Sequence, residues 1–231
     1  ETVRQLVADV GVGPLDRVEV DIDLAGALAG GLGGGHGIAL IAGTGSSCYG
    51  RDASGAKWQT GGWGSLLDDV GGATWIGTQA MVAAIRAFDG RGVPTVLVER
   101  ILEHFGIVEM RELLPKVDAD GKSRAGRAQL AKLVTTAALE GDRASVRILE
   151  GGADALAECA EAAESKLDFS GEETIEVVAT GGIAENSAQY LGMIHAAVKR
   201  RVPKAVCVTP RMSNVEGAAM LARAGMLTRR G

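Results

Sequence analysis

Residues 38–50 read Ile-Ala-Leu-Ile-Ala-Gly-Thr-Gly-Ser-Ser-Cys-Tyr-Gly, an apolar run followed by a glycine-rich turn and a second extended run. The apolar run at 38–42 predicts a buried strand, and Gly43–Ser46 turns the chain back into a second strand over 47–50. A further turn leads into a third extended segment over 57–60. The sequence therefore predicts a three-stranded meander.

The rest of the chain shows helical and strand patterns in separate blocks. In the middle, apolar residues recur at three- and four-residue steps and predict four helices. Their approximate bounds are 76–87, 95–105, 127–139 and 142–167. Two strands then alternate with two helices, at 174–180, 186–200, 205–209 and 215–225. Such alternation favours a mainly parallel sheet, which binds ligands at the carboxyl ends of its strands.

Three short segments before the meander also carry a pattern. Residues 2–10 are predicted to be helical, 16–20 extended and 23–30 a helix of small residues. Within the longest helical pattern, Gly151 and Gly152 each cost about 1 kcal/mol relative to alanine. The two glycines indicate either close helix packing or a kink.

The composition restricts the class of protein. The 34 glycines among 231 residues are about twice the usual 7% and cluster in turns, where the backbone approaches a ligand or other backbone. A net charge of -5 argues against nucleic acid or anionic lipid as the main partner. No apolar run reaches the roughly 18 residues of a membrane span.

Cysteine and histidine are sparse and scattered. Three cysteines offer no disulfide framework, which predicts a reduced, cytoplasmic protein. The three histidines form no metal-binding pair, so no zinc or iron site is expected. These residues are Cys48, Cys159 and Cys207, and His36, His104 and His195.

Two segments have the residue types that phosphoryl transfer requires. Gly43–Ser46 would present several backbone N–H groups to phosphate oxygens, although the same four residues are also typical of an ordinary hairpin turn. Asp23, at a predicted helix start, could accept the proton of a substrate hydroxyl, or could simply cap that helix.

Two further glycine motifs are open to two interpretations each. Gly61–Gly64 surrounds Trp63 and precedes Asp68 and Asp69, residue types that could contact a polyol or hold hydrated magnesium, or form a structured loop. Gly181-Gly182 ends a predicted strand, where an adenosine could lie on the backbone, or where a tight turn suffices. No Walker-type nucleotide motif occurs in the sequence.

The order of these motifs, from about Asp16 to Arg223, resembles the BadF/BadG/BcrA/BcrD ATPase family, and within it the N-acetylglucosamine and glucosamine kinases. This resemblance implies an α/β fold, namely an actin-like ATPase (ribonuclease H-like) domain with a mixed sheet and a helical subdomain inserted at roughly 72–170. It also implies an ATP- and Mg²⁺-dependent kinase that phosphorylates an amino sugar on a hydroxyl group.

The resemblance assigns roles by position. Asp23 matches the catalytic base, and Ala128 matches a nucleotide-contacting alanine. The magnesium ion is expected to arrive with ATP, with no direct protein ligand. The second phosphate hairpin matches Gly43, Thr44, Gly45 and Ser46, with Thr44 touching ATP; the sugar contacts match Gly62, Trp63, Gly64 and Asp69; the adenosine motif matches Gly181 and Gly182.

Two departures from the family pattern stand out. Relatives often carry an acid where this chain has Val70, which bears on substrate identity. These kinases also begin with an actin-like domain that carries a first phosphate hairpin, and no such motif occurs here. We therefore expect residues 1–231 to be the C-terminal half of the enzyme, requiring an N-terminal actin-like domain in cis or in trans. Relatives are commonly homodimers, and we expect a partner face on the helices at 127–167.

Two other functions remain open at this stage. Family members that activate acyl-CoA dehydratases or benzoyl-CoA reductase carry cysteines for an iron–sulfur cluster, whereas the three cysteines here form no evident pair. A non-catalytic kinase-like module is the third hypothesis, against which the intact Asp23 and glycine motifs argue.

Overall fold

The computed structural model describes residues 22–120 and 124–228. The helix predicted at 2–10 and the strand predicted at 16–20 lie outside the described residues. None of the described helices combines the length and the apolar character that crossing a membrane requires.

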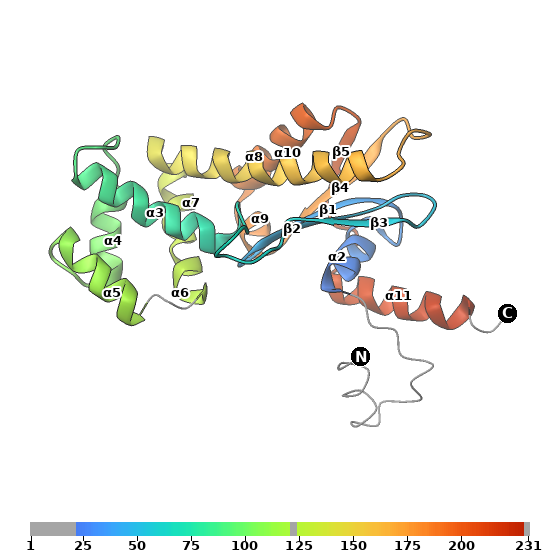
Figure 1. Ribbon diagram of the computed structural model, residues 1–231, viewed down its shortest axis with the longest axis horizontal. Helices are drawn as coiled ribbons and strands as arrows, with labels where there is room; N and C mark the ends of the chain where they lie inside the picture. Colours follow the sequence, from blue (N-terminus) through green and yellow to red (C-terminus); the bar gives the residue numbers. More distant parts are fainter. Residues whose placement is uncertain (1–21, 121–123, 229–231) are drawn as a thin grey trace, which may run out of the picture.

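A five-stranded mixed sheet forms the centre of the molecule, in the order β3-β2-β1-β4-β5 (Figure 1). Strands β1, β2 and β3 form the predicted antiparallel meander, and β4 and β5 extend it as strands parallel to β1. Their bounds are Gly37–Ala42, Ser46–Arg51, Lys57–Thr60, Ile175–Thr180 and Ala205–Val208. Ala42 pairs with Ser46 and Ile41 pairs with Thr180, so the turns after β1 and β4 meet at one edge of the sheet.

Helices cover both faces of this sheet. In Figure 1, α8 (Arg143–Lys166) and α10 (Ala188–Arg201) lie above it, and α2 (Asp23–Leu32) and α11 (Asn214–Thr228) lie below it. Alternation along the strands explains the division, because successive side chains point to opposite faces. Ile38 and Leu40 join the larger core under α8 and α10, while Ala39 joins the smaller core with α2.

The remaining helices form a helical subdomain beside the sheet (Figure 1). Its elements are α3 (Ala73–Phe88), α4 (Leu97–Phe105), the 3-10 turn η2 (Met110–Glu112), α5 (Leu113–Asp120), α6 (Arg124–Gln129) and α7 (Ala131–Leu139). The prediction of a single helix over 127–139 is wrong in one respect, because the helix is interrupted at Leu130, which separates α6 from α7. The elements η2 and α5 are too short to show a clear period in the sequence.

The helix predicted over 186–200 also differs in detail. Gly182–Glu185 forms a separate turn, α9, and α10 begins at Ala188. The Ser187 side chain accepts a hydrogen bond from the Tyr190 N–H at 3.2 Å, which caps the new helix and fixes its first residue.

Gly152 allows close packing between α8 and the rest of the core. The buried hydroxyl of Tyr190 donates to the Gly71 carbonyl oxygen at 2.8 Å. A Cβ on Gly152 would lie 2.6 Å from that hydroxyl oxygen and 3.0 Å from the Gly71 Cα. Burial raises the pKa of the Tyr190 phenol, so the group remains a neutral donor. Of the two interpretations of Gly152, the structure therefore supports close packing.

The adjacent glycines provide a matched pair of stability variants. Gly152→Ala should lower the free energy of unfolding by about 1–3 kcal/mol, because the new methyl group overlaps Tyr190 and the Gly71 backbone. Gly151→Ala should raise it by about 0.5–1 kcal/mol, because a Cβ there meets only Trp75, at 3.7 Å. Urea unfolding of both variants tests this, and equal effects would contradict the packing described.

Candidate functional site

The turn between β1 and β2 presents unused backbone donors at the sheet edge. The Gly43 N–H donates to the Gly45 carbonyl oxygen at 2.9 Å, inside the turn. The N–H groups of Thr44 and Gly45 donate to no acceptor within residues 22–120 and 124–228. Two open N–H groups at the tip of a glycine-rich turn are a typical binding site for an anion.

The turn after β4 lies directly against this hairpin. Gly181 has a φ of 103°, a conformation that favours glycine. A Cβ on Gly181 would lie 2.6 Å from the Ala42 carbonyl oxygen and 2.9 Å from the Gly43 nitrogen. At Gly182, by contrast, no atom lies within 4 Å of an added Cβ. The second glycine therefore faces open space beside the hairpin.

Glu185 braces the turn at Gly181, a role that sequence reasoning missed. Its carboxylate accepts a hydrogen bond from the Thr180 hydroxyl at 2.5 Å and one from the Gly181 N–H at 2.9 Å. The Thr180 hydrogen bond, followed by that of Gly181, lowers the pKa of Glu185. An acid in the first turn after a double glycine was the available signal, since carboxylates there often bond to free N–H groups.

The first turn of α3 fixes the hairpin from the other side. The N–H of Ala73 donates to the Gly43 carbonyl oxygen at 2.8 Å, and that of Thr74 to the Thr44 carbonyl oxygen at 3.0 Å. A Cβ on Gly72 would lie 2.5 Å from the Gly45 carbonyl carbon. Because the two hairpin carbonyls bond to α3, the open N–H groups are held in one orientation.

The loop 61–64 lies next to the hairpin and exposes an indole. Gly61, Gly62 and Gly64 all have positive φ, and the Trp63 residue between them is 77% exposed. The loop is tied back by carboxylates, since the Gly64 N–H donates to Asp69 Oδ1 at 3.3 Å. An exposed aromatic face with glycines on both sides is accessible to a flat polyol.

Val70 connects this loop to the hairpin through its backbone. The Ser46 hydroxyl donates to the Val70 carbonyl oxygen at 2.9 Å. The connection does not depend on the side chain at position 70, because it involves only the carbonyl oxygen.

Asp69 is buried, and its partner Arg124 was not found from the sequence. Asp69 is 2% exposed, and its Oδ2 accepts a hydrogen bond from Arg124 Nη2 at 2.6 Å. It has a φ of 59°, a costly value for a residue other than glycine. Asp68 Oδ2 instead accepts a hydrogen bond from the Trp63 backbone N–H at 3.5 Å. The two neighbouring acids therefore do not present free carboxylates to one magnesium ion.

No group of three potential metal ligands from His, Cys, Asp and Glu gathers anywhere in the described part of the chain. The cysteines lie on three elements and are free: Cys48 on β2, Cys159 on α8 and Cys207 on β5. Burial raises the pKa of all three thiols, that of Cys159 to about 11. Neutral thiols are poor metal ligands, because the thiolate is the ligating form.

The two remaining predicted site residues make no hydrogen bond with the hairpin. Asp23 is exposed as the first residue of α2, and the cap position belongs to Ile22, whose side chain makes no capping hydrogen bond. The interpretation of Asp23 as a helix cap is therefore wrong by one position. Ala128 is half-buried on α6, one helical turn after Arg124. Helix α6 packs on α3, where a Cβ on Gly77 would overlap the Arg127 carbonyl oxygen.

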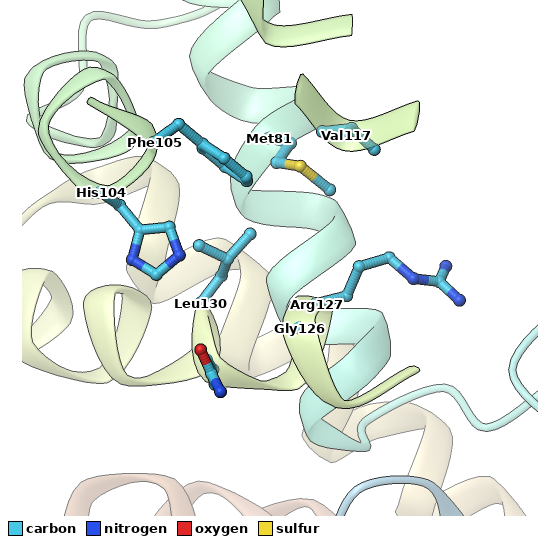
Figure 2. Close-up of a pocket in the computed structure, with 8 residues that line it drawn as sticks. Met81, His104, Phe105, Val117, Gly126, Arg127 and Leu130 are labelled. Atoms are coloured by element: carbon cyan, nitrogen blue, oxygen red, sulfur yellow. The ribbon is translucent and has the colours of Figure 1, made fainter. Parts of the chain in front are cut away.

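A pocket of about 220 Å³ lies inside the helical subdomain (Figure 2). In Figure 2, His104, Phe105, Met81 and Leu130 surround its centre, and the Arg127 side chain points away from it. The pocket is smaller than the roughly 300–1,000 Å³ of most ligand sites. The open donors at the sheet edge therefore make the better candidate site.

A family model places the chain among known proteins. Residues 3–222 match the model of the BadF/BadG/BcrA/BcrD ATPase family. The chain belongs to this family. One relative, the N-acetylmuramic acid/N-acetylglucosamine kinase of Clostridium acetobutylicum, is 30% identical over 95% of this chain and 72% of its own length. The N-acetyl-D-glucosamine kinase of Dictyostelium discoideum is 30% identical over 80% of this chain and 59% of its own length.

Solved structures share the fold. A Chromobacterium violaceum protein described as an N-acetylglucosamine kinase superposes with a TM-score of 0.70 at 24% identity, over 87% of this chain and 64% of its own. A ROK family glucokinase from Streptomyces griseus superposes with a TM-score of 0.52 at 16% identity, over 89% of this chain and 68% of its own. The chain thus spans about two thirds of each of these proteins. The predicted actin-like ATPase fold is confirmed.

The brace at Glu185 should make stability depend on pH. A carboxyl group with a lowered native pKa contributes stability above its unfolded pKa, near 4.5, and loses it as the pH falls through the native pKa. Glu185→Gln should therefore be less stable than the native protein at pH 7, and the gap should close in acid. Urea unfolding between pH 3 and 7 measures this, and a gap that does not change with pH would contradict the role of the charge.

Proposed function

We propose that this chain is the nucleotide- and base-bearing half of an ATP-dependent kinase that phosphorylates an amino sugar, N-acetylglucosamine or glucosamine, on a hydroxyl group. The observation that carries the proposal is the meeting of two glycine turns at one edge of the sheet. Gly43–Gly45 offers two open N–H groups, and Gly182 faces open space beside them. Family membership and the names of the relatives support the sugar kinase activity.

The nucleotide would lie across the two turns. The hairpin from Gly43 to Ser46 would bind phosphate oxygens through the N–H groups of Thr44 and Gly45 and the exposed Thr44 side chain. Gly181 and Gly182 would support the adenosine, with Ala128 as a further contact from α6. A magnesium ion bound to ATP would neutralise charge on the phosphate oxygens.

The sugar would lie on the loop 61–64. Trp63, with Gly62 and Gly64, would contact the sugar ring, and Asp69 would contact a hydroxyl. Asp23 would accept the proton of the attacking hydroxyl, a role that suits an exposed carboxylate with no hydrogen-bond partner among the described residues.

Efficient transfer would need a second actin-like domain, in cis or in trans. Phosphoryl transfer depends on positioning both substrates and on stabilising charge from several sides. We expect the assembled enzyme to be a cytoplasmic homodimer, with the partner face on α6, α7 and α8.

Nucleotide binding is tested by thermal unfolding. MgATP should raise the melting temperature of the native chain, because a ligand that binds only the folded state stabilises it. Gly182→Val should keep the melting temperature without ligand but lose most of the MgATP shift, since its side chain would fill the open space. Gly171→Val, at another open glycine, is the matched control and should keep the shift. A native chain with no shift at millimolar MgATP would contradict the proposal.

Catalysis is tested separately. The isolated chain with MgATP and N-acetylglucosamine or glucosamine should form sugar phosphate slowly or not at all, because half of the cleft positions the substrates poorly. Addition of an N-terminal domain from a relative should increase product formation. Robust turnover by the chain alone would contradict the assignment as half of an enzyme, although the kinase activity would then stand.

A further inference from the structure

Arg124 lies over the tip of the glycine hairpin. Its Nη2 atom bonds to Asp69 Oδ2 at 2.6 Å, and a Cβ built on Gly45 would lie 2.1 Å from that same nitrogen. Asp69 Oδ2 lies close by, 2.3 Å from the same built Cβ. The Arg124–Asp69 ion pair is therefore next to Gly45, in the turn that carries the open N–H groups of Thr44 and Gly45. A cation, its paired carboxylate and two N–H donors thus lie in one small region.

The position of Arg124 is fixed at two points. The Thr74 hydroxyl, in the first turn of α3, donates to the Arg124 carbonyl oxygen at 3.2 Å. Asp69, buried and held by the Gly64 N–H, accepts from the guanidinium. The side chain nevertheless remains 51% exposed. A guanidinium has five N–H donors, and within the described residues this one makes a single hydrogen bond, so most donors remain available.

We propose that Arg124 is a further catalytic residue that binds the γ-phosphate of ATP held in the hairpin, and that Asp69 positions it. The inference rests on the proposed kinase function. In the transfer step, the sugar hydroxyl oxygen forms a bond to the γ-phosphorus as the bond to the β–γ bridging oxygen breaks. Asp23 takes the hydroxyl proton, and ADP leaves.

Arg124 would stabilise the negative charge that develops in this step. Negative charge develops on the γ-phosphoryl oxygens and on the leaving bridging oxygen, and a planar guanidinium can bond to two of these oxygens at once. The β-phosphate would keep the hairpin N–H groups as its donors. Arg124 therefore distinguishes ATP from ADP, whereas the hairpin binds both.

The test is the affinity of the native chain and its variants for MgATP and MgADP, measured by titration calorimetry without sugar. Arg124→Ala should weaken MgATP binding by about tenfold or more, as expected for a lost charge-assisted hydrogen bond. MgADP binding should change by less than about twofold. Arg124→Lys should keep part of the ATP preference, because a point charge remains.

Two further variants control for structure. Arg127→Ala removes an arginine from the same helix whose side chain bonds to Thr78; both affinities should stay unchanged. Arg124→Gln retains a donor for Asp69 without the charge, and should lose the ATP preference even if Arg124→Ala fails to fold.

The outcomes separate the two claims. Equal losses of ATP and ADP affinity, or no loss, would overturn the role of Arg124 while leaving nucleotide binding in place. A native chain that binds neither nucleotide would overturn the kinase proposal together with this inference. A selective loss of ATP affinity, absent from Arg127→Ala, supports both.

Discussion

The close approach of backbone to backbone at the sheet edge is the constraint on which the rest of the structure depends. Gly181 touches Ala42 and Gly43, and Gly72 touches Gly45, at distances that leave no room for a side chain. Parallel pairing of β1 with β4 brings the first two turns together. A side chain at either glycine would separate the turns, and the open N–H groups would no longer lie beside Gly182.

A small set of polar contacts transmits this arrangement to the helices. Tyr190 holds Gly71 to α10, Glu185 holds the turn after β4, and Arg124 joins α6 to Asp69. Each contact involves a buried group or a strained turn, where losing one partner leaves the other unsatisfied. The helical subdomain is thus connected to the sheet at the point where the nucleotide is proposed to bind.

Local patterns predicted much of this fold. The apolar run at 38–42 and its glycine turn predicted the meander, and alternation at the end of the chain predicted the parallel strands. The motif order identified the family that the model match confirms. The break at Leu130 was not predictable, because α6 and α7 each carry apolar residues in one continuous helical period.

Contacts between residues far apart in the sequence could not be predicted from it. Arg124 and Asp69 lie 55 positions apart, and no sequence motif contains both residues. The burial of Asp69 and its pairing with Arg124 likewise depend on tertiary packing. The roles of Asp23, Trp63, Asp69, Ala128 and the glycines in binding remain predictions.

The most direct test of the central claim is amide hydrogen exchange of the chain with and without MgATP. The account predicts fast exchange at Thr44 and Gly45 in the free protein, since their N–H groups have no acceptor among the described residues. MgATP should slow exchange at these two amides and around Gly181-Gly182. Protection confined to the pocket of the helical subdomain, or no protection, would contradict the account.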